Sequence, residues 1–186
     1  MCDVVRHDTC NTSGPTWHHM ALAAAVATYA LFFSLYQIHY HQAFWSGLDL
    51  ISVQQPIWNT LHGHFMRATY FPFTGEPISN FPRPRYESLF ADHVQPTLLV
   101  LTVPYALVPR SEVFGVVLSI SVALGALPLY SIARRRLRSE SWALLFAVGY
   151  LLLPVVETAS GWDIHGTGFL PPLLLAALDA AEVGAV

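Results

Sequence analysis

An uncharged, apolar run from Val113 to Ala133, followed at once by Arg134-Arg135-Arg136-Leu137-Arg138, constrains this chain more than any other feature of its sequence. As a helix, such a run spans about 31 Å, which matches the hydrocarbon core of a bilayer. Four of the nine basic residues lie at one end of the run, and arginine clusters mark the cytoplasmic end of a span. The sequence therefore predicts a polytopic membrane protein oriented by this junction.

The composition agrees with a membrane protein. Hydrophobic residues make up 54% of the chain and charged residues 11%, against about 25% charged residues in soluble domains. The net charge of −3 and the lack of a basic stripe argue against a nucleic-acid partner. Cys2 and Cys10 lie in the polar N-terminal tail, outside any metal-ligand spacing, and we interpret them as free thiols.

We expect an all-α fold with about four membrane segments. They are residues 17–38, 113–133, 140–157 and 168–186, with a cytoplasmic tail at 1–16, a cytoplasmic arginine loop at 134–139 and an external loop at 158–167. The first segment is too long for the apolar core of a signal peptide. The last one carries Asp179 and Glu182, and an acid at mid-membrane costs about 2.5–3.5 kcal/mol. We therefore expect these two acids to face a partner chain.

The long segment 39–112 decides on which side the polar groups lie. Apolar residues at helical spacing predict an interfacial helix at 50–62, which Gly63 ends, and a second one at 96–108. Residues 95–109 would form a helix of about 22 Å, which is short for a span. If this segment does not cross, the whole loop is external and the N-terminus is cytoplasmic. If it crosses, Asp49 and Asp163 lie on opposite sides of the membrane.

Under the first topology, carboxylates and imidazoles gather at the external face: Asp49, Asp92, His93, Glu157, Asp163 and His165. Such groups bind divalent metals or move protons at neutral pH. Each also has a plainer interpretation. Asp49 can be the N-cap of the helix that follows it. Asp92-His93 can simply place a negative charge near the positive N-terminal end of the helix that begins at Pro96. Asp163 and His165 would share one side of an extended backbone, or lie in the loop without a role.

Four ordered motifs resemble one family. They are Leu48-Asp49-Leu50 with Gln55-Pro56-Ile57-Trp58-Asn59-Thr60-Leu61-His62-Gly63-His64, then Ala91-Asp92-His93-Val94-Gln95-Pro96, then Leu124-Gly125-Ala126-Leu127-Pro128-Leu129-Tyr130, and last Trp162-Asp163-Ile164-His165. In this order they look like the bacterial membrane proteins called "domain of unknown function 2079". The resemblance covers about Leu48 to Leu178.

That family in turn looks like the GT-C superfamily of membrane glycosyltransferases. The resemblance implies an enzyme of the bacterial inner membrane that takes a sugar from a polyprenyl-phosphate carrier at the external face. Asp49 matches the first-loop acid expected to act as the base, and Asp92, His93, Asp163 and His165 match residues expected to hold a divalent metal. Two departures stand out: Gln54 replaces a usual acid, and family members continue beyond Val186, so we expect a shortened, N-terminal module.

The rival hypothesis is a non-catalytic subunit of a larger membrane complex, structural or cofactor-holding. Histidines near helix ends, His18, His19 and His39, are candidate ligands of a haem or chlorophyll-type cofactor. Under either hypothesis we expect membrane lipid and other membrane protein chains as partners.

Overall fold

The computed structural model describes residues 17–68, 88–92, 94–162 and 164–184, and every named element in these ranges is a helix. The elements are α1 (Trp17–Gln42), α2 (Leu48–Leu61), α3 (Leu89–Asp92), η1 (Pro96–Leu101), α4 (Thr102–Leu107), α5 (Glu112–Leu124), α6 (Ala126–Leu137), α7 (Glu140–Leu151), α8 (Pro154–Gly161), η2 (Gly166–Phe169) and α9 (Leu170–Gly184). The predicted all-α fold is confirmed for this part of the chain.

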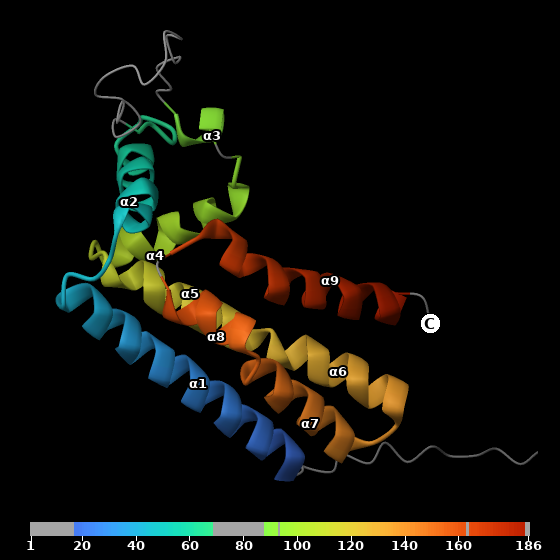
Figure 1. Cartoon of the computed structure of the whole chain (residues 1–186). Coiled ribbons are helices and arrows are strands. Elements are labelled where there is room, and N and C mark those ends of the chain that lie inside the picture. Colours follow the sequence, from blue (N-terminus) through green and yellow to red (C-terminus); the bar gives the residue numbers. More distant parts are fainter. Residues whose placement is uncertain (1–16, 69–87, 93, 163, 185–186) are drawn as a thin grey trace, which may run out of the picture.

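The long helices form a bundle. Helix α1 packs along α5 and α7, and α6 packs against α7 and α9 (Figure 1). At one end, which we call the arginine end, His18 of α1 meets Glu140 and Ser141 of α7, beside the turn that follows α6. At the other end, which we call the loop end, α2 and α4 pack together with η1.

Two helices are long and apolar enough to cross a bilayer, namely α1 and the combined stretch Glu112–Leu137, each of 26 residues. Helices α7 and α8 qualify as a third span only if taken together across a bend of 48°. Helix α9 has 15 residues, shorter than the roughly 20 that a span needs, and is not among the candidates. The expectation of four spans is therefore met for two segments, or three with the bent pair.

The short segment before α5 does not run along the bundle. It forms η1 and α4, which pack on α2 at the loop end (Figure 1). Nor do the arginines form the loop expected at 134–139. The last turn of α6 contains Arg134, Arg135 and Arg136, and the helix ends only at Leu137. The backbone of Arg138 then adopts the left-handed conformation, with φ of 51°. Ser139 then caps α7, so the turn between the two helices is very short.

The family-like motif around Gly125 marks a break between α5 and α6. Pro128 has no N–H, so the hydrogen bond back to Leu124 is missing. At the same place, the Tyr150 hydroxyl donates to the carbonyl of Val122 at 3.1 Å. A Cβ on Gly125 would lie 2.5 Å from that hydroxyl oxygen. The glycine thus allows α7 to approach the break closely.

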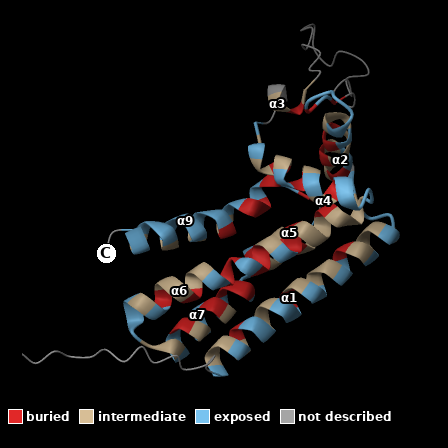
Figure 2. Cartoon of the chain, turned by 180° about the vertical axis from the view of Figure 1, so that it is seen from behind, coloured by how far each residue is buried: buried red, intermediate tan, exposed pale blue. Residues whose placement is uncertain are grey.

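The core runs through the bundle and into the loop end, where α2, η1, α4 and η2 also contribute buried residues, while the outer faces of α1 and α7 are exposed and apolar (Figure 2). Phe114, Leu118 and Val122 of α5 are fully buried, and so are the small residues Ala143 and Ala147 of α7. Small residues let membrane helices approach each other closely. Exposed Leu, Phe and Val on the outer faces suit contact with lipid.

Candidate functional site

Helix α2 positions Asp49 in its first turn. The N-cap is Gly47 and makes no side-chain cap hydrogen bond, so the interpretation of Asp49 as the N-cap is wrong. The buried side of α2 consists of Leu50, Val53, Pro56 and Ile57, and the helix packs on η1 and α4. Asp49 is half-exposed. Its carboxylate is therefore available to a partner outside α2.

That partner is His165, which lies between α8 and η2. Its Nε2 is 3.3 Å from Oδ2 of Asp49, and the two side chains are 51% and 48% exposed. At this exposure the pair can meet a substrate, and its ionic attraction adds little to stability. The sequence placed both residues at one face but did not predict that they touch.

Backbone and side-chain contacts hold the segment around His165. Ile164 is buried, and it lines a small void together with Gln37 of α1 and Leu50 of α2. On the other side of the histidine, the Thr97 hydroxyl of η1 donates to the carbonyl of Gly166 at 3.3 Å. The segment is thus anchored to three different helices.

The remaining predicted ligands cannot be placed. Asp92 ends α3, but its side chain, His93 and Asp163 lie outside the described residues. Within the part that the structure describes, no group of three His, Cys, Asp or Glu side chains gathers. Of the four predicted metal ligands, only His165 has a described side chain, so the described residues supply one ligand toward a cation.

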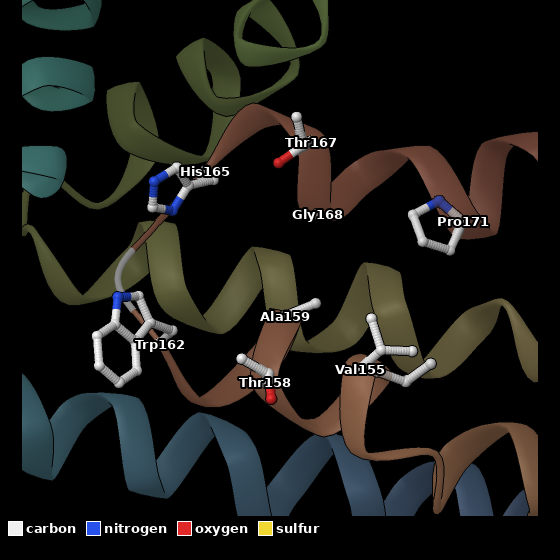
Figure 3. A pocket seen from close by; sticks show the side chains of 9 residues that line it. Val155, Thr158, Ala159, Trp162, His165, Thr167, Gly168 and Pro171 are labelled. Carbon is white, nitrogen blue, oxygen red and sulfur yellow. The ribbon is translucent and has the colours of Figure 1, made fainter.

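A groove of about 420 Å³ opens beside His165, between α8 and the η2–α9 segment (Figure 3). It is lined by Val155, Val156, Thr158, Ala159, Trp162, His165, Thr167, Gly168 and Pro171. The lining is mostly apolar, and polar groups are concentrated toward the His165 end (Figure 3). Such a groove suits a long hydrocarbon chain whose polar head reaches the histidine.

The model of one protein family, described as "Predicted membrane protein (DUF2079)", matches residues 39–182. The chain belongs to this family. The match contains the site helix α2, the His165 segment, the groove, α6 and all but the last two residues of α9. No curated protein matches the chain, and neither does any solved structure.

In this DUF2079 protein, much of the motif after Asp49 builds the end of α2. The Asn59 side chain donates to the carbonyl of Arg67 at 2.7 Å, and the Thr60 hydroxyl accepts from the Met66 amide at 2.8 Å. Gly63 has φ of 86°, which confirms it as the residue that ends the helix. His62 stacks on Trp58 with ring centroids 3.8 Å apart. These residues shape the turn, whereas Asp49 contacts the imidazole of His165 in a distant segment.

Sequence reasoning missed a polar network beside the site. The amide of Gln54 accepts from Ser111 at 2.7 Å and donates to the Tyr105 hydroxyl at 3.3 Å, which joins α2 to α4 and to the start of α5. Next to it, Arg110 donates to Glu112 at 2.8 Å, and this hydrogen bond raises the pKa of Arg110. Only the departure from the family pattern at Gln54 could have drawn attention to this position.

Proposed function

We propose that this membrane protein transfers a sugar from a polyprenyl-phosphate carrier to a hydroxyl acceptor at the loop end. One observation supports this most: His165 belongs both to the pair with Asp49 and to the lining of the apolar groove. A lipid chain in the groove would bring its phosphate to the imidazole. The sugar carried on that phosphate would then lie beside the carboxylate.

The chemistry requires one base and one stabiliser of negative charge. The Asp49 carboxylate accepts the proton of the acceptor hydroxyl as its oxygen bonds to the anomeric carbon. The bond between that carbon and the phosphate oxygen breaks, and its electron pair remains on the lipid phosphate. His165 donates a hydrogen bond to this phosphate. When a divalent cation is bound, His165 would instead ligate it, together with Asp92, His93 or Asp163, and the cation would supply the positive charge beside the phosphate.

The orientation is part of the proposal. We place the arginine end in the cytoplasm and the loop end outside, because arginine clusters stay on the cytoplasmic side. The N-terminal end of α1 is then cytoplasmic, since His18 contacts Glu140 at the arginine end. For a bacterial protein this corresponds to the inner membrane, with the site facing outward.

The test is release of polyprenyl phosphate from a panel of radiolabelled polyprenyl-phosphate hexoses and pentoses, supplied together with a panel of hydroxyl acceptors, with the whole chain in lipid nanodiscs. We expect release from at least one carrier, loss of release in Asp49→Asn, and normal release in the control Glu112→Gln. That control removes another carboxylate of the loop end, one paired with Arg110. No release from any carrier, or equal release by Asp49→Asn, would overturn the proposal.

A further inference from the structure

Gln37 is a buried polar side chain in the membrane helix α1, with only 8% of its surface exposed. Its amide nitrogen donates to the carbonyl of Ser160 at 2.7 Å and to the carbonyl of Trp162 at 2.6 Å. Both N–H groups of the amide are thus committed to the end of α8. Gly115 of α5 makes room for this side chain, since a Cβ there would lie 2.9 Å from Cβ of Gln37.

The two carbonyls are groups that a helix cannot satisfy itself. The last carbonyls of α8 have no amide one turn ahead, and a buried carbonyl without a partner costs about 1–3 kcal/mol. Gln37 therefore caps α8 from a neighbouring helix. This role alone would be structural, but the second carbonyl belongs to Trp162, the residue that begins the approach to His165.

Only two residues separate Trp162 from His165, and Ile164 among them is buried against the same small void that Gln37 lines. Fixing the Trp162 carbonyl therefore limits where the imidazole can lie relative to α2. We infer that Gln37 is a positioning residue, which holds His165 at contact distance from Asp49. Its catalytic meaning rests on the proposed function, whereas its geometric effect does not.

Tyr29 provides a matched comparison on the same helix. Its hydroxyl donates to the carbonyl of Val156 at 2.9 Å and lies 3.0 Å from the Ser160 hydroxyl. It is as buried as Gln37 and anchors the same helix α8. The Tyr29 hydroxyl makes no hydrogen bond to the carbonyl of Trp162, which Gln37 holds. Tyr29→Phe thus removes comparable hydrogen bonds without releasing the carbonyl nearest His165.

The experiment measures whether positions 49 and 165 stay close. Asp49→Cys and His165→Cys are combined in the full chain, with Cys2→Ser and Cys10→Ser, and cross-linked in nanodiscs with dibromobimane, whose fluorescence rises when both ends react. We expect Gln37→Met to slow cross-linking about tenfold, the equivalent of about 1.4 kcal/mol. Tyr29→Phe should change the rate less than twofold, a difference below about 0.5 kcal/mol.

A second variant guards against misfolding. Gln37→Asn keeps the amide but is shorter by one methylene, so it cannot reach both carbonyls. We expect this variant to cross-link more slowly, while its unfolding midpoint stays close to that of Tyr29→Phe. Equal slowing by Tyr29→Phe would reduce Gln37 to a stabilising residue and overturn the inference. An unchanged rate in both Gln37 variants would do the same. Since no substrate is present, the result is independent of whether the protein transfers sugar.

Discussion

Arg135 donates to Asp179 across 2.6 Å, and this pair joins α6 to α9 near the arginine end. The same guanidinium reaches Glu182 at 3.2 Å, while Arg136 contacts that acid at 2.7 Å. The expectation that the two acids of the last segment face a partner chain is therefore wrong. They are neutralised within the chain, which removes the reason for expecting a partner there.

The first prediction concerns this ion pair. Arg135 and Asp179 are 30% and 26% exposed, between the surface and buried regimes, so Arg135→Gln should lower the free energy of unfolding by about 1–2 kcal/mol. Arg134 is exposed and makes no ion pair within the described residues. Arg134→Gln, the control, should have less than about a 0.5 kcal/mol effect. Thermal unfolding in nanodiscs measures both, and equal effects would contradict the pairing.

The second prediction separates activity from stability at Asp49. Because the pair with His165 is half-exposed, Asp49→Asn should change the free energy of unfolding by less than about 1 kcal/mol. The same variant should lose release of polyprenyl phosphate. A variant that unfolds, measured by circular dichroism, would instead assign Asp49 a structural role.

The third prediction tests the break between α5 and α6. Gly125→Ala places a methyl 2.5 Å from the Tyr150 hydroxyl, and overpacking of this kind costs about 1–3 kcal/mol. Gly149→Ala is the control, since nothing lies within 4 Å of its added Cβ. That change should stabilise α7 by up to about 1 kcal/mol. If Tyr150→Phe restores the stability of Gly125→Ala, the hydroxyl contact is responsible, whereas equal unfolding midpoints of the two alanine variants would refute it.

The fourth prediction concerns orientation. His64, which follows α2, and Thr167, which lies in η2, are exposed and belong to the loop end. Single cysteines at these two positions should react with an impermeant thiol reagent in intact cells, in a background without Cys2 and Cys10. A cysteine at Ser139, in the turn at the arginine end, should react only after the cells are opened. Labelling of Ser139→Cys in intact cells would reverse the proposed sidedness. Labelling of only one loop-end position would contradict the placement of both on one side.

Local patterns predicted the fold better than they predicted contacts. The long apolar runs and the glycine at position 63 indicated helices and a helix end, because length, hydrophobicity and glycine's tolerance of positive φ act within a few residues. The end of α6 was missed, since arginine has a good helix propensity and nothing in the local pattern forces a loop there.

The candidate site depended on contacts between distant residues. Counting the membrane spans placed Asp49 and His165 at one face of the membrane. Their contact, however, requires that α1 hold α8 in place and that α2 pack on η1. Those contacts join residues far apart in the sequence and leave no local signal. The pairing of α6 with α9 was missed for the same reason. Opposite charges were visible in both segments, yet the sequence did not indicate that the two helices are neighbours.

With Asp179 and Glu182 turned toward α6, every exposed residue of α9 is apolar or glycine. These include Leu173, Leu174, Leu178 and Val183, each more than half exposed. The outward face of α9 therefore offers hydrocarbon and no charge to whatever surrounds it. Any neighbour there, lipid or protein, is recognised by shape and packing alone, so high salt would leave such an association intact while detergent would dissolve it.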